Sequence, residues 1–211
     1  MIIAIDGPTA AGKGTLARLL AQHFDLAYLD TGSIYRALAS RVRENDIDVE
    51  NEKAVTAEAK KIGPDDLVRS DLREEEIGQL ASKVAAMPGV RQVLLNFQRD
   101  FAGNPPDGAK GAVLDGRDIG TVICPDANLK LYITASAEVR ASRRHKELIG
   151  KGVAAIHAEI LADLKARDLR DQSRSAAPSK PADDAVVLDT SKMTSEAVLE
   201  KALELVAGIQ Q

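Results

Sequence analysis

A glycine-rich stretch near the start of the chain, GPTAAGKGT at residues 7–15, has the composition of a phosphate-binding loop. The common pattern is G-x-x-x-x-G-K-[ST]; here Gly14 follows Lys13, so the hydroxyl of Thr15 comes one position late. Successive backbone N–H groups in such a turn form a concave anion site, and the lysine can reach terminal phosphates. The simpler alternative is a tight strand-to-helix turn with a solvated lysine. The candidate nucleotide-binding residues are Gly7, Pro8, Thr9, Ala10, Ala11, Gly12, Lys13, Gly14 and Thr15.

Three further stretches place arginines and aspartates where a second phosphate could bind. They read DTGSIYR at residues 30–36, DGRDIGT at residues 115–121 and R-D-x-x-D-x-x-R at residues 167–174. An acceptor monophosphate carries a charge of about −2 near neutral pH, and planar guanidinium groups bind it through paired hydrogen bonds. Phosphoryl transfer requires such positive charge at the transferring group. The predicted catalytic residues are Lys13, Arg36, Arg117 and Arg174.

The elements that must position these residues alternate along the chain. Short apolar runs predict buried strands at residues 1–6, 26–29, 112–115, 129–134 and 185–188. Helical spacing predicts helices at residues 15–23, 33–44, 50–61, 73–86, 88–101, 137–149, 153–170 and 195–206, with turn-like segments at 62–72 and 104–108. Strands separated by helices predict an α/β fold with a five-stranded parallel sheet covered on both faces. Ligands then bind at the carboxyl ends of the strands, where Asp6, Asp30, Asp115 and Asp189 all fall.

In these motifs and their order the chain resembles the bacterial cytidylate kinases, a family of P-loop nucleoside monophosphate kinases. In many of those kinases the phosphate loop contains the sequence GKGT. The family carries D-[ST]-G-x-x-Y-R after its second strand and D-G-R-D-x-G-T after its third, then R-D-x-x-D-x-x-R and D-T-S. The matching segments here are residues 30–36, 115–121, 167–174 and 189–191. The resemblance covers nearly the whole chain in order.

The resemblance implies a fold and a reaction. The fold is a three-layer P-loop NTPase fold forming one kinase domain over residues 1–211, with an acceptor-binding excursion at about 33–104 and a lid at about 137–152. The reaction transfers the γ-phosphoryl group of Mg·ATP to CMP or dCMP, with Arg143 contacting the nucleotide. No direct metal ligand is implied: Mg²⁺ would be carried by ATP, with Thr15 and Asp115 able to contact it through water.

The resemblance also implies roles in the acceptor site. The residues that match readers of the cytosine edge are Ser82, Arg91 and Asp118. Those that match residues near the ribose are Tyr35, Arg167 and Asp171. The complete predicted acceptor site is Asp30, Thr31, Tyr35, Arg36, Ser82, Arg91, Arg117, Asp118, Arg167, Asp171 and Arg174. Residues 51–72 are shorter than the β-rich insert of better-known relatives, so the preference among CMP, dCMP and UMP stays open.

Two helices also have simpler interpretations. Arg167 could form exposed i,i+4 ion pairs with Asp163 and Asp171, although the motif context favours ligand binding. A second cluster shares one face of the preceding helix and could be a solvated face or part of a mobile lid: Arg140, Arg143 and Arg144.

Composition excludes several functional classes. The 211 residues are 45% hydrophobic and 28% charged, which is typical of a folded globular protein. Aromatic residues make up 3%, without Trp, and the net charge is −4, which argues against nucleic-acid binding. The single Cys124 fits a reducing compartment. We expect a cytoplasmic monomer that binds small-molecule substrates and no membrane.

Two alternatives to the CMP kinase hypothesis remain at this point. One is a P-loop kinase for another acceptor, such as UMP, AMP or an alcohol; the number of arginines disfavours an alcohol. The other is a nucleotide-dependent switch, although the N-K-x-D guanine reader of GTPases does not occur in the sequence.

Overall fold

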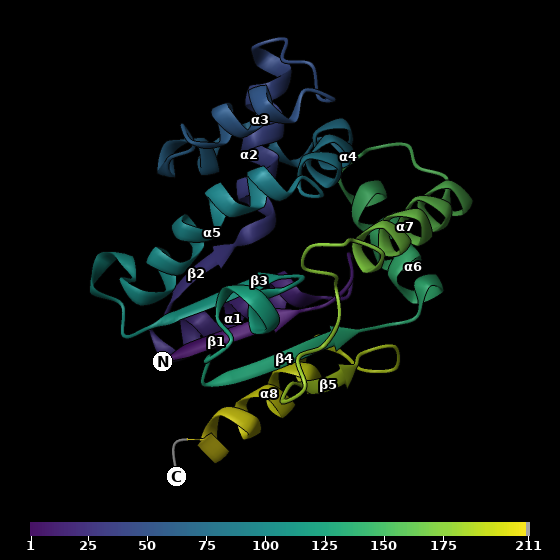
Figure 1. The fold of residues 1–211 in the computed structure, drawn as a ribbon. Coiled ribbons are helices and arrows are strands. Elements are labelled where there is room, and N and C mark those ends of the chain that lie inside the picture. The colour runs from purple at the N-terminus through teal and green to yellow at the C-terminus, as the bar shows by residue number, and fades with distance from the viewer. Residues whose placement is uncertain (210–211) are drawn as a thin grey trace.

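The protein is built around one sheet of five parallel strands in the order β2-β3-β1-β4-β5 (Figure 1). This computed structural model describes residues 1–209. The strands are β1 (Ile2–Asp6), β2 (Ala27–Asp30), β3 (Ala112–Gly116), β4 (Leu129–Thr134) and β5 (Val186–Asp189). The predicted α/β class and five-stranded parallel sheet are therefore confirmed.

Helices cover both faces of the sheet. They are α1 (Lys13–Phe24), α2 (Thr31–Glu44), α3 (Glu52–Ala59), α4 (Glu75–Val84), α5 (Pro88–Gly103), α6 (Ala137–Gly150), α7 (His157–Gln172) and α8 (Ser195–Ile209). Helices α1 and α8 pack on one face, and α2 and α5 pack on the other. Helices α6 and α7 pack against each other beyond the carboxyl ends of the strands (Figure 1). None of the helices described is long and apolar enough to cross a membrane.

Alternation along the central strands separates the two layers of the core. Ile3 and Ile5 of β1 belong to the cluster with α1 and α8, whereas Ala4 belongs to the cluster with α2 and α5. On β3, Val113 joins the first cluster and Leu114 the second. Both faces of these strands are buried, which is why they are continuous apolar runs in the sequence. Each buried branched side chain contributes about 1.5–3 kcal/mol, so the sheet is a firm base for the loops at its carboxyl edge.

The chain leaves the sheet after β2 and returns at β3 through α2, α3, α4 and α5 (Figure 1). Within this excursion, α3 packs against α2 and α5, and α4 packs against α2. Both helices lie at the end of the molecule opposite α8. The turn-like segment predicted at 62–72 consists of two short 3₁₀ helices, Pro64–Val68 and Ser70–Arg73. A third, Pro106–Gly108, lies in the predicted linker. Of the domain predicted over residues 1–211, residues 210 and 211 lie outside the described chain.

Several local predictions were wrong or incomplete. Helix α7 begins at His157 rather than near 153, because the turn that ends α6 extends to Val153, whose N–H bonds the Leu148 carbonyl at 3.0 Å. Helices α1 and α2 begin at Lys13 and Thr31, each two residues earlier than predicted. A π-helical turn at Ile119–Ile123 follows β3, where no helix was predicted.

Candidate active site

The phosphate loop connects β1 to α1 in the strand–turn–helix context that the sequence predicted. Gly7 has φ +142°, and a Cβ there would lie 1.9 Å from the carbonyl oxygen of Ile133 on β4, so the position requires glycine. Ala10 and Gly12 also have positive φ, at +62° and +99°. Left-handed residues interspersed in a tight turn give the backbone of an anion-binding nest, which here opens at the N-terminus of α1.

Lys13 is held inside this loop. Its side chain is buried, and Nζ donates to the Pro8 carbonyl oxygen at 2.9 Å. Burial and the nearby charge of Arg117 lower the pKa of Lys13 to about 7, while Asp115 and Asp30 act in the opposite direction. The ammonium is therefore destabilised in the ligand-free protein, and an arriving phosphate would compensate it.

The unusual Gly14 faces the end of β3. A Cβ on Gly14 would lie 3.1 Å from Oδ2 of Asp115 and 3.5 Å from the Tyr28 hydroxyl. That hydroxyl donates to Asp115 Oδ2 at 3.3 Å. Burial and the charge of Asp30 raise the pKa of Asp115 to about 7, against the opposing effect of Lys13. The space beside the residue after the lysine is thus occupied by Asp115 and Tyr28, which explains why a small residue stands there.

Arg117 joins the phosphate loop to α7. Its Nη2 donates to the Thr9 hydroxyl at 2.6 Å, and its Nε donates to Asp171 Oδ2 at 2.9 Å. Nη1 donates to the Gly116 carbonyl at 3.0 Å, which fixes the guanidinium at the end of β3. Burial disfavours the charge, but Asp171 outweighs it, and the pKa of Arg117 is raised.

A cluster of arginines surrounds Asp171, which is itself 3% exposed. Arg174 donates to the second carboxylate oxygen of Asp171. Burial, followed by the like charges of Arg117 and Arg36, lowers the pKa of Arg167 to about 10. The Nε atoms of Arg167 and Arg174 are buried without a hydrogen-bond partner among residues 1–209. Exposed i,i+4 pairing is therefore the wrong interpretation of this helix face, and the excess positive charge suits an anion.

The residues predicted to contact the cytosine base also lie close to one another or to their neighbours across the site. Arg91 on α5 donates to Oδ2 of the buried Asp118 and lies over the Tyr35 ring, 5.8 Å from its centroid. Burial opposes the charge of Arg91, but Tyr35 and Asp118 raise its pKa. Ser82 on α4 is 3% exposed, and its hydroxyl accepts a hydrogen bond from Nη1 of Arg170 at 2.9 Å. Arg170 is absent from the predicted site.

Two side chains that the sequence placed at strand ends hold the loop after β3. Asp6 accepts hydrogen bonds from the N–H groups of Ile119 and Gly120, both at 2.8 Å, and burial raises its pKa to about 6. Thr31 donates to the main-chain oxygen of Asp115 at 2.8 Å. Thr31 was predicted to bind the acceptor nucleotide. Asp6 was not among the predicted site residues, although its position at the end of β1, directly before Gly7, could have indicated it.

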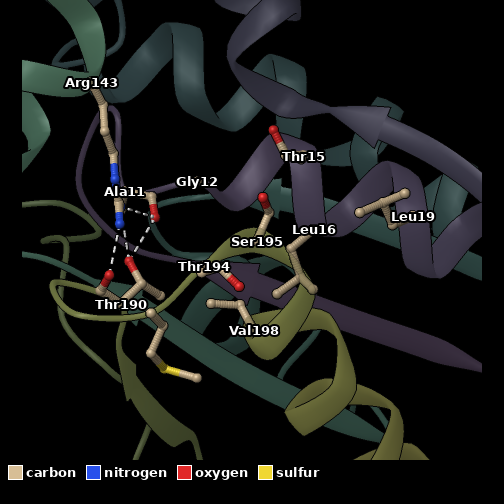
Figure 2. A pocket seen from close by; sticks show the side chains of 11 residues that line it. Ala11, Gly12, Thr15, Leu16, Leu19, Arg143, Thr190, Thr194, Ser195 and Val198 are labelled. Carbon is tan, nitrogen blue, oxygen red and sulfur yellow. Dashed lines mark hydrogen bonds between the residues drawn. The ribbon is translucent and has the colours of Figure 1, made fainter.

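A cavity of about 350 Å³ lies beside the phosphate loop (Figure 2). Arg143 points into its edge and donates to the hydroxyl and carbonyl oxygens of Thr190, at 3.0 and 2.7 Å, and to the Ala11 carbonyl at 3.4 Å. The lining comes from the phosphate loop and α1, from one arginine of α6, and from the β5–α8 turn and the start of α8: Ala11, Gly12, Thr15, Leu16, Leu19, Arg143, Thr190, Met193, Thr194, Ser195 and Val198. An apolar wall with a few polar groups suits a planar base beside the loop. The β5–α8 wall was missed, although the D-T-S motif pointed to it.

Arg140 is buried rather than solvated. Its guanidinium forms two hydrogen bonds with Asp168 of α7, at 3.1 and 2.6 Å, and one with the Thr9 carbonyl at 3.2 Å. Its Nε donates to the Ala135 carbonyl at 2.9 Å. The solvated-face interpretation of the α6 arginines is thus wrong for this residue, which attaches the base of α6 to the phosphate loop.

Comparisons with known proteins agree with one another. A family model described as cytidylate kinase matches residues 3–208. A cytidylate kinase of Paramagnetospirillum magneticum is 54% identical over 207 residues, covering 98% of this chain and 98% of that protein. A cytidylate kinase of Methylocella silvestris is 53% identical over 206 residues, covering 98% and 94%. Among solved structures, an uncharacterized protein from Eubacterium ventriosum matches with a TM-score of 0.57 and 16% identity over 99% of this chain and 98% of that one. That last likeness concerns the fold alone.

Proposed function

This chain belongs to the cytidylate kinase family, and we propose that it transfers the γ-phosphoryl group of ATP to CMP or dCMP, giving ADP and CDP or dCDP. The position of Arg117 is the observation that carries the proposal. Its guanidinium contacts Thr9 of the phosphate loop at 2.6 Å and Asp171 of α7 at 2.9 Å. It therefore lies between the loop that would hold the donor phosphates and the helix that would hold the acceptor, where phosphoryl transfer needs positive charge.

In this proposal the protein supplies position and charge rather than a general base. The attacking oxygen of a nucleoside monophosphate is already anionic, so neutralisation and alignment suffice. Arg36, Arg117 and Arg174 bind the acceptor phosphate. Lys13 exchanges its hydrogen bond to Pro8 for one to the terminal phosphates of ATP. The lowered pKa of Lys13 is consistent with a cation that regains its full charge only beside an anion.

The acceptor base would be read by the group around Asp118. A carboxylate oxygen accepts a hydrogen bond from the exocyclic amine of cytosine, whereas the carbonyl of uracil at that position would leave this oxygen without a donor. Arg91 and Ser82 supply donors for the ring acceptors, and Tyr35 and Arg167 lie toward the ribose together with Asp171. Because Asp118 is 5% exposed, a carboxylate oxygen facing the uracil carbonyl would be costly even with Arg91 bound to the other oxygen, which favours CMP over UMP.

ATP would place its base in the cavity beside the phosphate loop, with Arg143 at the rim. We assign residues 33–104 as the acceptor-binding excursion and 137–152 as a lid. The excursion already contacts the rest of the site, since Arg91 within it donates to Asp118 after β3. Closure of both segments would exclude water from the transferring phosphoryl group.

Magnesium fits the residues present as a water-bound partner of ATP. Within residues 1–209, no three acidic, histidine or cysteine residues are placed to hold a metal ion by themselves. The negative charges of Asp115 and Asp30 nevertheless lie close enough to Lys13 to favour its ammonium, and burial together with the charge of Asp30 raises the pKa of Asp115. The Thr15 hydroxyl follows the loop. These oxygens would hold Mg²⁺ through its water shell, as this ion prefers. The ion would neutralise phosphate charge.

We further propose that the enzyme acts as a cytoplasmic monomer on small molecules alone. The net charge of −4 and the absence of Trp support the exclusion of nucleic acids. The buried, single Cys124 is consistent with a reducing compartment.

The proposal is tested by measuring ADP release from Mg·ATP with CMP, dCMP, UMP, AMP, GMP or no acceptor. We expect rapid release with CMP and dCMP, little with the purine nucleotides, and almost none without an acceptor. Equal use of UMP would mean that the base site does not exclude uracil. Failure with every monophosphate would overturn the kinase proposal.

A further inference from the structure

One hydrogen bond crosses from α7 to the acceptor excursion at the base-reading residue. Arg170 extends from α7, and its Nη1 lies 2.9 Å from the hydroxyl oxygen of Ser82 on α4. A second crossing lies near the start of α4, where Arg144 of α6 pairs with Glu75 at 3.0 Å. Both contacts join the packed pair of helices α6 and α7 to α4, but only the first ends on a residue of the proposed base site.

The first contact favours the donor role of the Ser82 hydroxyl toward the base. A guanidinium can only donate, so the serine oxygen accepts from Arg170 with one of its two lone pairs, and its own proton is left for another partner. Donation from a charged group also polarises the O–H bond and strengthens the hydrogen bond that it donates in turn. Ser82 is 3% exposed, so few competing water molecules can reorient it.

We propose that Arg170 is a positioning residue for base specificity, which acts by orienting the Ser82 proton toward the base. The inference rests on the proposed function. The ring nitrogen beside the amine of cytosine is an acceptor, and the same nitrogen of uracil carries a hydrogen. A serine held as a donor therefore matches cytosine and opposes uracil. A serine free to rotate could accept from uracil, so Arg170 would add to the discrimination made by Asp118.

The test compares kcat/KM for CMP and for UMP at saturating Mg·ATP in four variants: R170M, R170K, S82A and S82A/R170M. Methionine keeps the length of the side chain but cannot donate. We expect R170M to lower the CMP-to-UMP ratio about tenfold, the scale of one charged hydrogen bond, without changing KM for ATP. R170K should recover part of the ratio, because lysine can still donate. In the S82A background, R170M should change the ratio no further.

The matched control is R144M, which removes the other crossing and leaves Ser82 untouched. If Arg170 only helps α4 to dock, R144M and R170M should change the ratio alike, and the inference is wrong. It is also wrong if R170M keeps the wild-type ratio, or lowers it as much in the S82A background. A wild-type enzyme without CMP activity would instead overturn the proposed function, and this inference with it. Urea unfolding of each variant verifies that the fold is retained.

Discussion

The donor side and the acceptor side of the site are held by different kinds of contact. On the donor side the backbone makes the shape: Gly7 and Gly12 adopt positive φ, and Lys13 bonds the Pro8 carbonyl within its own loop. On the acceptor side the shape comes from side chains on separate elements, such as Arg117 and Asp171. The donor side is thus a local structure, whereas the acceptor side exists only when distant segments meet.

This difference has an energetic consequence. A backbone nest tolerates most changes in neighbouring side chains, but it fails when a required glycine is replaced. An ion-pair network has the opposite sensitivity, because removing one member leaves the others buried and uncompensated. Arg117 belongs to both sides, since it bonds Thr9 as well as Asp171. Substitutions can therefore separate the two kinds of construction.

The largest effect is expected where the two sides join. R117Q removes the positive charge between donor and acceptor, and we expect kcat/KM for CMP to fall by about 10³–10⁵-fold, the range found for arginines that stabilise the transferring phosphoryl group. R117K, which keeps the charge but not the fork, should lie between R117Q and wild type. The matched control is R18Q, on the exposed side of α1. Steady-state kinetics measures all three, and an R117Q enzyme within tenfold of wild type would contradict the assignment.

The next effect probes the acceptor side alone. D171N leaves Arg117 and Arg174 without their shared carboxylate, and we expect the free energy of unfolding to fall by about 3–5 kcal/mol. Inorganic phosphate should restore more stability to D171N than to wild type, because it binds the folded arginine cluster.

Urea denaturation with and without phosphate measures both quantities for D171N. The control is D163N, an exposed position on the same helix. Equal stability of D171N and D163N would mean that the network contributes little to the fold.

The same contrast explains how much the sequence could reveal. The donor side was predictable because its signals are contiguous: an apolar run, a glycine-rich turn and a helix starting near Lys13. The order of strands and helices was predictable for the same reason. The turn that shortens the start of α7 was not, since it depends on how α6 ends around Gly152, which has φ +73°.

The acceptor side was less predictable because the directions of long side chains are set by tertiary packing. The motifs led to Arg117 and Asp171, which do meet. Residue types alone could not show that Arg140 is buried against Asp168, or that Arg170 crosses to Ser82. Arg140 and Arg170 each contact an element far away in the sequence, and no local periodicity records that.

A smaller effect is expected from substitutions that change only the backbone of the donor side. Gly7 and Gly12 both have positive φ, but only at Gly7 would a Cβ collide, 1.9 Å from the Ile133 carbonyl oxygen; nothing described lies within 4 Å of a Cβ on Gly12. G12A should therefore cost only the left-handed conformation, about 1–2 kcal/mol. G7A should cost about 1–3 kcal/mol more, for the displaced backbone. Urea unfolding of the two variants gives the difference directly, and equal losses would contradict the steric argument.

The smallest effect concerns pH and the groups facing the loop. Asp115 has a pKa of about 7 in the folded protein, above its usual 3.8, so the folded state binds a proton that the unfolded state has lost between those values. Its contribution to stability is thus complete below about pH 4 and disappears as the pH rises through 7. Asp6, with a pKa of about 6, acts in the same direction over a narrower window. The pKa of Lys13 is lowered to about 7. The folded protein therefore gains stability from this group as the pH rises from about 7 toward 10.5, the usual pKa of lysine.

D115N should therefore reduce the loss of stability that the ligand-free protein shows between about pH 4 and 7. Part of the decline should remain, because Asp6 still titrates. The exposed D25N variant should keep the full wild-type profile. Denaturation at about pH 5 and about pH 7 measures the slope. An unchanged slope in D115N would mean that Asp115 is already charged beside Lys13 in the folded protein, and that the two groups compensate each other before any phosphate arrives.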